Sequence, residues 1–578
     1  MLALLPTATQ ATLQGGLSLL DGAVLLGVLA AVTWLGHARS GKQTELKDFF
    51  LGGRSLPWWA VAASIVATEI SAVTFVSLPS VVWREGGNLT YLQIGLFGSL
   101  VARAVVGFVL VPAYYEREIY SPYDYVAQRF GEAGRRVTTA LFTLGGILGQ
   151  SARVYLTAVV FEVVLFDELA AVEAATGIPP LAASVLVIAV VAIAWTWMGG
   201  IATVVWTDAA LFLLFLLGIA ATLIFLGGEL SGGLWGALSE GWDAGKFQLL
   251  DTSWDPHRAY TLPVALLVAS WGQIGPYGTD QLMVQRLLCC SDARQARKAI
   301  LASMGGMGVT FLVGTVGVAL WAWTREFELS AAGAAMVAEK PDRIFPVIIA
   351  EVLPNGVKGL VLAGAFAAAI SSLDSILAAL SQTTLTALGR AEGEAKETLR
   401  LSRLLVLVYG ALLAAAALGI DAVAGRYASI LDLALAMAGY TGGALLAAFF
   451  LAWWKPLRVN GSGLVWSAPL SVLAVFALAW HQVWAQQRVV QVAVLMLGLW
   501  LLLPAARRRS MRRTLTLLAG LALCWALARY GVLPPDGTPL PWPWYLPTGA
   551  VVAFAFGWLL DEERDGPAVP GAGEVELS

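Results

Sequence analysis

The chain is poor in the residues that build catalytic and metal centres. Its 578 residues include only three cysteines and three histidines. Cys289, Cys290 and Cys524 lack the spacing of a metal site, and the histidines lie far apart in the sequence. The apolar segments contain no metal-ligand cluster and no nucleophile–base pair, which argues against an intramembrane enzyme. We therefore expect no catalytic activity.

Charged residues are also scarce. Only 13% of the residues are Asp, Glu, Lys or Arg, whereas 58% are hydrophobic, and the mean hydropathy is +0.74. The formal net charge of −3 gives no basis for binding nucleic acid. Most of a chain this apolar fits in a lipid bilayer, whose core is crossed by about 20 apolar residues. The first residues lack the basic region of a signal peptide, so we expect none to be cleaved.

About fifteen apolar runs are long enough to cross a bilayer. They lie near 17–37, 57–82, 90–114, 138–166, 181–199, 203–228, 262–287, 299–324, 357–388, 401–420, 428–453, 462–482, 488–505, 514–530 and 546–560. Lys and Arg gather in the loops that follow odd-numbered runs, including Glu116–Arg136, Arg286 to Lys298 and RRRSMRR at 507–513. FDELAAVEAATGIPP, at 166–180, is expected to be a loop on the opposite side. The positive-inside rule then predicts a multi-pass protein of the inner or plasma membrane, with its N-terminus outside and its C-terminus in the cytoplasm.

The run LAGAFAAAISSLDSILAALSQTTLTAL, at 362–388, combines a spanning length with polar groups. It carries Ser371, Ser372 and Asp374. Because a carboxylate in hydrocarbon is costly, Asp374 is expected to face a cavity, a partner or an ion. Oxygen-only ligands suit a hard cation such as Na⁺ better than a transition metal. This run therefore predicts ion-coupled transport.

Two of the predicted spans are interrupted. The second contains ATEISAVTFVSLPS, with Glu69 in mid-span and Pro79 near its end. The seventh contains WGQIGPYGTDQ, with Pro276 between glycines. Such interruptions in corresponding halves are typical of transporters built from inverted repeats with broken helices. Spans two to six and seven to eleven would then form two repeats of five helices.

Five stretches resemble motifs of the sodium:solute symporter family, in family order. They are FFLGGRSLPWWAVAASIVATEISAVTF at 49–75, YSPYDYVAQRFG at 120–131, TWMGGIATVVWTD at 196–208, YGTDQLMVQRLL at 277–288 and FAAAISSLDSILAALS at 366–381. The resemblance implies an all-α, leucine-transporter-like inverted repeat of 5+5 helices with flanking spans. The expected parts are the N-terminal end and first span (1–48), the two repeats (49–230 and 231–460), additional C-terminal spans (461–560) and a disordered cytoplasmic tail (561–578). It also implies Na⁺-coupled symport of a small organic solute by alternating access.

The resemblance further implies a sodium site between the second and ninth spans. The matching positions are the backbone carbonyls of Ala67, Ile70 and Ala368 and the hydroxyls of Ser371 and Ser372. An unwound helix frees carbonyl oxygens for such a site, and adjacent serines add two more. The alternative is that the serines only hydrogen-bond to the backbone of their own helix.

Two further carboxylates each have two open interpretations. Asp208 matches a carboxylate that some family members use for a second sodium or for its exit path. Otherwise it is an interfacial carboxylate at a helix start, where its charge suits the helix dipole. Asp374 either assists sodium binding or hydrogen-bonds to a neighbouring helix. Asp280 and Gln281, near a helix end, are expected to be structural.

Arg153 is the main candidate for contact with the solute. In sialic acid transporters of the family, an arginine in the same span binds the substrate carboxylate, which the planar guanidinium matches with two hydrogen bonds. Alternatively, Arg153 pairs with Glu162 or Glu69, or extends to an interface. Arg103 is a second candidate, and Glu69 would compensate one of the two arginines. Further lining candidates are Thr68, Thr74, Gln93, Gln150 and Gln273, with Phe75, Tyr91, Trp58 and Trp271 as aromatic walls.

A sugar is a poor match to these positions. Residues that bind or gate sugar in relatives align with Val73, Thr74 and Pro276, and a hexose needs many placed donors and acceptors. We expect a carboxylate or other organic anion. The alternatives are a proton-coupled carrier in which Glu69 or Asp374 titrates, a sodium–sugar symporter, and a membrane transceptor or sensor. The expected partners are a small-molecule solute and the lipid bilayer, and the sequence defines no oligomeric state.

Overall fold

The computed structural model describes residues 16–39, 51–70, 72–119, 121–198, 201–390, 395–424, 429–454, 459–479, 511–530 and 540–561. Within these residues the chain is helical and contains no strand. Nine helices there are long and apolar enough to cross a membrane, and a bent pair of shorter helices would make a tenth span. These ten correspond to ten of the first eleven predicted spans, so the chain is a multi-pass membrane protein. The predicted thirteenth span, 488–505, lies outside the described residues, and the total of fifteen stays a prediction.

The elements follow one another in two groups. The first group comprises α1 (Leu19–Arg39), η1 (Gly52–Arg54), α3 (Trp58–Glu69), α4 (Ala72–Trp83), η2 (Ile94–Gly98), α5 (Ser99–Val105), η3 (Val106–Leu110), α6 (Val111–Glu116), α7 (Pro122–Val164), α8 (Phe166–Thr176), α9 (Pro180–Met198), α10 (Ile201–Glu229) and α11 (Gly233–Asp243). The second comprises α12 (Leu262–Val264), η4 (Ala265–Ala269), α13 (Ser270–Gly278), α14 (Gln281–Leu288), α15 (Ala293–Ala302), η5 (Ser303–Gly305), α16 (Gly306–Glu326), α17 (Ala331–Glu339), η6 (Pro341–Arg343), α18 (Ile344–Glu351), α19 (Val357–Ala387), α20 (Ala395–Ala424) and α21 (Ile430–Trp453). The C-terminal part adds α22 (Leu464–Ala479), α25 (Met511–Tyr530), η7 (Trp542–Trp544) and α26 (Tyr545–Leu559).

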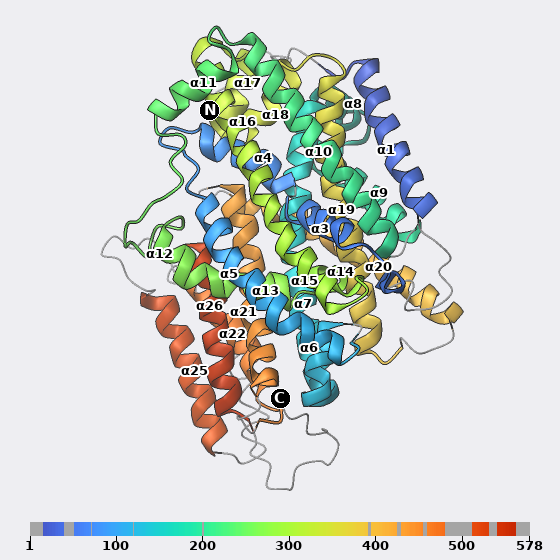
Figure 1. Ribbon diagram of the computed structural model, residues 1–578, viewed down its shortest axis with the longest axis vertical. Helices are drawn as coiled ribbons and strands as arrows, with labels where there is room; N and C mark the ends of the chain where they lie inside the picture. Colours follow the sequence, from blue (N-terminus) through green and yellow to red (C-terminus); the bar gives the residue numbers. More distant parts are fainter. Residues whose placement is uncertain are drawn as a thin grey trace, which may run out of the picture.

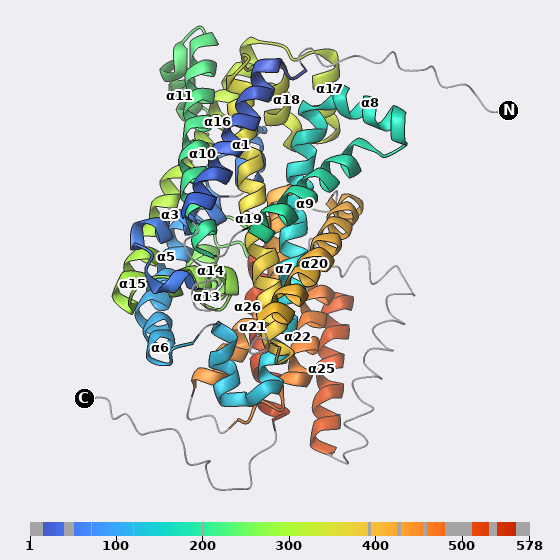
Figure 2. The same ribbon diagram turned by 90° about the vertical axis from the view of Figure 1, so that its right-hand side faces the viewer.

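Helix α19 forms the centre of the bundle. It packs against α1, α7, α9, α10 and α20 and lies in the interior in both views (Figures 1 and 2). Its most apolar stretch is almost entirely buried. Alanine, glycine and serine dominate its sequence, and small residues let membrane helices approach closely. The short helices α8, α11, α17 and α18 gather at one end of the molecule in both views.

Both predicted interruptions are present as breaks between helices. α3 and α4 meet at an angle of 55°, and Ile70, which follows α3, has non-helical backbone angles (φ −83°, ψ 80°). α13 ends at Gly278 and α14 begins at Gln281. The Asp280 carboxylate accepts a hydrogen bond from the Leu282 N–H at 2.8 Å and so caps α14, which confirms its structural role.

Three segments expected to be loops contain helical residues. Most of Glu116–Arg136 belongs to α7, because Ser121 and Asp124 form a capping box around Pro122 and start the helix there. The stretch after the fourth span forms α8, which ends at Gly177 in the left-handed conformation (φ 73°). Arg286 does not belong to a cytoplasmic loop, since it lies within α14 and only 1% of its surface is exposed. Its acidic partner, described below, explains how the charge is tolerated at this depth.

Candidate functional site

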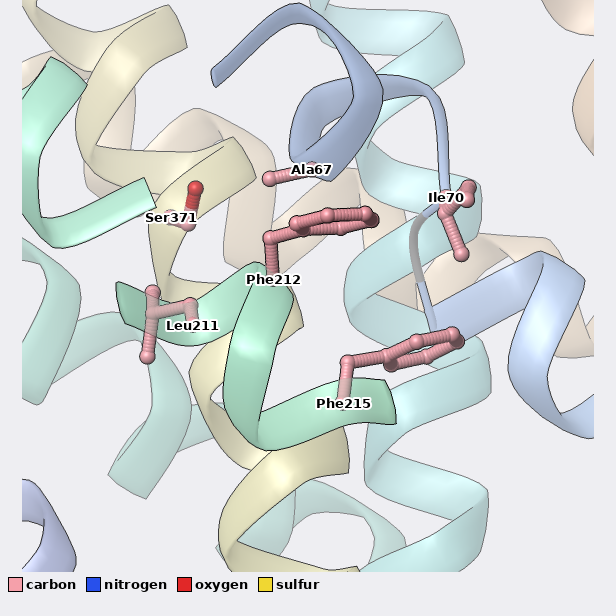
Figure 3. A pocket seen from close by; sticks show the side chains of 6 residues that line it. All are labelled: Ala67, Ile70, Leu211, Phe212, Phe215 and Ser371. Carbon is pink, nitrogen blue, oxygen red and sulfur yellow. The ribbon is translucent and has the colours of Figure 1, made fainter. Parts of the chain in front are cut away.

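A small cavity lies at the break between α3 and α4. Its volume is about 10 Å³, room for roughly one water-sized particle. It lies between the end of α3, α10 and α19 and is lined by Ala67, Ile70, Leu211, Phe212, Phe215 and Ser371 (Figure 3). Three of the five predicted sodium ligands therefore meet around one ion-sized space.

The chemistry around this cavity suits a hard monovalent cation. α3 ends at Glu69, and the last carbonyl groups of a helix have no donor in their own helix. The carbonyls of Ala67 and Ile70 belong to this end, and Ser371 adds a hydroxyl from α19. The side chains that α10 contributes to the wall are all apolar. Carbonyl and hydroxyl oxygens around an ion-sized space fit Na⁺.

The remaining predicted sodium ligands lie on α19 and are not among the residues that line this cavity. Ser372 is not among the lining residues, but its Oγ is 3.4 Å from Nη1 of Arg153. The same Nη1 donates to the carbonyl oxygen of Thr68 at 3.0 Å, at the end of α3. Ala368 lies one turn earlier on α19. Arg153 thus reaches both halves of the predicted sodium site, which the sequence did not indicate.

A buried ion pair lies on the other side of Ser371. Nη2 of Arg286 is 3.0 Å from Oδ2 of Asp208, and both residues are at most 1% exposed. The carboxylate also accepts hydrogen bonds from Ser64, at 2.5 Å, and from Ser371. The interfacial interpretation of Asp208 is therefore wrong, and Ser371 does not bond only within its own helix. The pair joins α3, α10, α14 and α19 around the small cavity.

Asp374 is buried one turn along α19 from the cavity, with 5% of its surface exposed. The Ser375 hydroxyl contacts its carboxylate at 3.3 Å. Across the described part of the chain it makes no ion pair and no hydrogen bond to another helix. The carboxylate is therefore a buried acid beside the Asp208–Arg286 pair with no partner on a neighbouring helix.

A second, larger cavity of about 270 Å³ adjoins the first. Ile70 lines both, so the two spaces share the break between α3 and α4. Its wall is formed by α3, α4, η2, α7, η4, α13, α14, α16 and α21, together with η7 and α26. The polar lining residues are Thr68, Glu69, Thr74, Tyr91, Gln150, Arg153, Gln273, Tyr277, Asp280 and Thr310. Most of the remaining wall is apolar or glycine, including Ile94, Met283, Met307, Leu431, Leu435, Trp542 and Leu546.

Arg153 and Gln150 present the main polar groups of α7 to this cavity. They are three residues apart and share one face of the helix with Gly146 and Gly149, which leave space in front of them. Oε1 of Gln150 is buried and has no hydrogen-bond partner among the described residues. Over the same residues, Arg153 makes no ion pair. A guanidinium donor and an unpaired amide acceptor therefore face the same space.

Glu69 compensates the other arginine. Its two carboxylate oxygens each lie 2.6 Å from Nη2 of Arg103, which is fully buried. Nε of Arg103 also donates to Ser303 at 3.0 Å, and its guanidinium lies 4.2 Å from the centre of the Tyr277 ring. Glu162 pairs with a different cation, Arg343, at 3.3 Å. The predicted internal partners of Arg153 are thus engaged elsewhere, and Arg103 is a counter-charge that does not line the cavity.

Several predicted lining residues lie elsewhere. Gln93 donates to the Tyr260 carbonyl at 2.8 Å and holds a loop. The Phe75 ring packs between Phe215 and Phe345, each with 5.0 Å between ring centres. The exposed rings Trp58 and Trp271 are likewise absent from the cavity wall. Thr74, Gln273, Tyr91 and Thr68 do line it.

The sequence also missed residues that the fold brings to the site. Arg286 has a signal, since it is a charge at the end of an apolar run, but the positive-inside count assigned it to a loop. Trp542 and Leu546 have no such signal, because only tertiary packing brings them to residues several hundred positions earlier in the chain.

The helical bundle with an ion-sized cavity beside a solute-sized cavity, both at a helix break, defines a membrane transporter and not an enzyme. A model of the sodium:solute symporter family matches residues 49–471, so the chain belongs to that family.

Relatives and a solved structure agree with this assignment. The sodium/sialic acid symporter SiaT of Proteus mirabilis is 27% identical over 462 residues, covering 79% of this chain and 88% of the relative. The human sodium-coupled monocarboxylate transporter 1 is 27% identical over 476 residues, covering 81% and 73%. The sodium/glucose cotransporter of Vibrio parahaemolyticus is 29% identical over 385 residues, covering 63% and 68%. The substrate-bound, outward-open structure of a Na⁺-coupled sialic acid symporter superposes with a TM-score of 0.68 at 22% identity, covering 94% of this chain and 97% of that one. The chain therefore shares this leucine-transporter-like fold.

Proposed function

We propose that the chain couples Na⁺ entry to the uptake of a small organic anion by alternating access. The observation that carries this proposal is that Ile70 lines both the ion-sized and the solute-sized cavity. Ions and solutes that share a broken helix can bias its position together, which is what coupled transport requires.

The sodium site is formed by the carbonyls of Ala67, Ile70 and Ala368 and the hydroxyls of Ser371 and Ser372. Asp208 acts on this site through Ser371, whose hydroxyl donates a hydrogen bond to the Asp208 carboxylate. The buried carboxylate orients that hydroxyl so that its oxygen lone pairs are available to the ion. Asp374 and Asp208 supply the negative charge for a second Na⁺ or for coupling.

The solute is a carboxylate whose charged end contacts Arg153. That arginine is the cavity guanidinium without an ion pair among the described residues. The unpaired Gln150 Oε1 beside it would accept from a donor group elsewhere on the solute, since a carboxylate has no hydrogen to donate. Glu69, Thr74 and Gln273 complete the polar part of the wall. Two of the relatives are named for acidic solutes, sialic acid and monocarboxylates. The third is named for glucose, which carries no carboxylate to match the Arg153 guanidinium.

The transport cycle follows from the same contacts. Na⁺ and the carboxylate bind from the outside, and one helix group then rocks against the other to open the site inward. One Na⁺ carried with one monocarboxylate moves no net charge, so its driving force is the sodium concentration gradient, about 1.4 kcal/mol for each tenfold ratio. Each Na⁺ beyond the first would move one net charge and add about 2.3 kcal/mol per 100 mV. In a proton-coupled carrier, the Arg103 counter-charge argues against Glu69 as the titrating group and leaves Asp374 for that role. The sodium-coupled relatives favour sodium over this alternative.

We place the two inverted repeats at 49–230 and 231–460, between a first span in 1–48 and the C-terminal helices in 461–560. The protein lies in the inner or plasma membrane, with its N-terminus outside and its C-terminal tail, 561–578, in the cytoplasm. The alternation of Lys and Arg along the loops supports this orientation.

Uptake into proteoliposomes tests the proposal. Radiolabelled monocarboxylates, sialic acid, amino acids and sugars are compared with and without an inward sodium gradient. Ser371→Ala is expected to weaken sodium activation by about 10–100-fold, as expected for the loss of one hydrogen-bond-strength contact to a charge. Ser381→Ala is the matched control, because Ser381 is equally buried on α19 but bonds to Ser402 on α20.

Arg153→Gln tests the solute contact. It should abolish carboxylate uptake while leaving sodium binding measurable. Uptake that does not depend on the sodium gradient but depends on a pH gradient would refute sodium coupling. An equal loss of sodium activation in Ser371→Ala and Ser381→Ala would refute the assigned ion site.

A further inference from the structure

The C-terminal elements η7 and α26 belong to the wall of the larger cavity. The family match ends at residue 471, well before them. Yet Trp542 and Pro543 of η7 and Leu546 of α26 all line the cavity that contains Arg153. The helices beyond the family core are therefore not only peripheral supports.

Glycines fix the start of α26 against the core. On α21, a Cβ on Gly443 would lie 2.3 Å from the Leu546 carbonyl oxygen, and one on Gly442 would lie 2.9 Å from the Leu546 Cδ1 atom. On α13, a Cβ on Gly275 would lie 3.4 Å from the same side chain. Backbones this close leave α26 little freedom to shift. Leu546 is thus held at a defined depth in the cavity wall, between α13 and α21.

Hydrogen bonds fix η7 against the first turn of α21 and the loop before α12. Nε1 of Trp542 donates to Oδ1 of Asp432, on the first turn of α21, at 3.1 Å. The Tyr260 hydroxyl donates to the same oxygen at 2.5 Å. Nε1 of Trp544 donates to the Pro256 carbonyl at 2.9 Å. The indole of Trp542 is therefore oriented by its ring nitrogen, and its apolar face forms part of the cavity wall.

From this geometry we propose that Leu546 and Trp542 form the apolar end of the solute site and set the length of the apolar chain that the solute carries. This inference rests on the proposed carboxylate contact at Arg153. A guanidinium on α7 and an apolar wall from η7 and α26 together fit an amphipathic solute, a carboxylate with an alkyl or aryl tail. A hydrophilic anion would leave this wall unused.

The size of Leu546 then decides which tail fits best. Each methylene that is buried contributes roughly a fourfold gain in affinity, until the tail meets the wall. Leu546→Ala removes three carbons and should shift the preferred acid towards longer chains. Leu546→Val removes one carbon and should shift it less, whereas Leu546→Phe should favour shorter chains.

The test compares sodium-driven uptake of a labelled acid in competition with linear monocarboxylates of increasing chain length. The full chain is used in proteoliposomes, as wild type and as the three Leu546 variants. Val551→Ala is the control, because Val551 lies on the same helix but is 69% exposed. The readout is the ratio of inhibition constants between acids, which does not depend on the amount of active protein.

We expect the longest acid that inhibits well to gain one to three carbons in Leu546→Ala, with about a fourfold change in ratio per carbon. Val551→Ala should keep the wild-type order. An unchanged order in folded Leu546 variants would overturn the inference and leave the carboxylate proposal intact. If the wild-type protein takes up no monocarboxylate in a sodium gradient, the proposed function is refuted, and with it the inference that rests on it. If Leu546→Ala cannot be purified, the milder Leu546→Val decides the question in the same assay.

Discussion

The buried pair Asp208–Arg286 offers a sharp test of how this bundle is held together. Asp208 is 0% and Arg286 1% exposed, and both form further hydrogen bonds, so neither charge has access to water. Asp208→Asn leaves the guanidinium without a counter-charge, and Arg286→Met leaves the carboxylate without one. Breaking a buried pair from one side costs about 3–5 kcal/mol, most of it from the charge left behind.

The double variant Asp208→Asn/Arg286→Met removes both charges at once. Its cost should not exceed that of either single variant, although some serine hydroxyls lose partners. The difference between the double variant and the sum of the single variants should therefore be at least about 3 kcal/mol. Equilibrium unfolding of the purified protein in detergent measures each value. Thr222→Val on α10 is the control, because the buried Thr222 hydroxyl bonds to the Gly218 carbonyl of its own helix, at 2.8 Å, and to no other described residue.

The same variants separate stability from sodium binding. Ser371 lines the ion-sized cavity and donates to Asp208, so Asp208→Asn should also lower sodium affinity, by about 10–100-fold. The double variant should recover stability but not sodium affinity, because the acceptor of Ser371 is still altered. Strictly additive stability costs would refute the ion-pair argument. Recovery of sodium affinity in the double variant would show that net charge, and not the orientation of Ser371, controls the site.

Three further substitutions test contacts outside the cavities. The Asp21 carboxylate of α1 accepts hydrogen bonds from two backbone N–H groups at the start of α19. Asp21→Ala should therefore lower the melting temperature, by the equivalent of about 1–2 kcal/mol, without changing sodium affinity. An unchanged melting temperature would contradict this prediction. Gly443→Ala should lower the free energy of unfolding by about 1–3 kcal/mol and reduce uptake, because its Cβ would collide with the Leu546 carbonyl. Gly228→Ala is the control, because Gly228 has open space around it and the substitution should change neither value. Lys246→Met should cost about 1–3 kcal/mol in unfolding experiments, because its ammonium group donates to three backbone carbonyls at the end of α4, at 2.6–3.3 Å.

The sequence predicts the helical class and the two broken helices because both are local. The length of an apolar run indicates whether it can cross the membrane, and Glu69 and Pro276 are polar or helix-breaking residues inside such runs. The candidate ion site is expected from the family resemblance, because the adjacent hydroxyls of Ser371 and Ser372 taken alone could bond to their own helix. Three of its predicted ligands do line one small cavity.

The pairing of charges is not readable in the same way. Glu69 and Arg103 are 34 residues apart, and Asp208 and Arg286 are 78 apart, so no local pattern joins them. Gln93 has the right chemistry for a cavity wall but binds a loop. Which polar side chain faces a cavity depends on helix rotation and on distant partners, and both are set by tertiary packing.

The charges at membrane depth give a physical reason for binding the ion and the anion together. Two arginines are already neutralised, Arg103 by Glu69 and Arg286 by Asp208. Arg153 faces the larger cavity, which it shares with Asp280. A solute carboxylate at Arg153 therefore adds negative charge near an existing acid, and a cation beside Ile70 offsets it. By thermodynamic linkage, if the cation raises the affinity for the solute by some factor, the solute raises the affinity for the cation by the same factor. Because Ile70 borders both cavities, this reciprocity needs no long pathway through the protein.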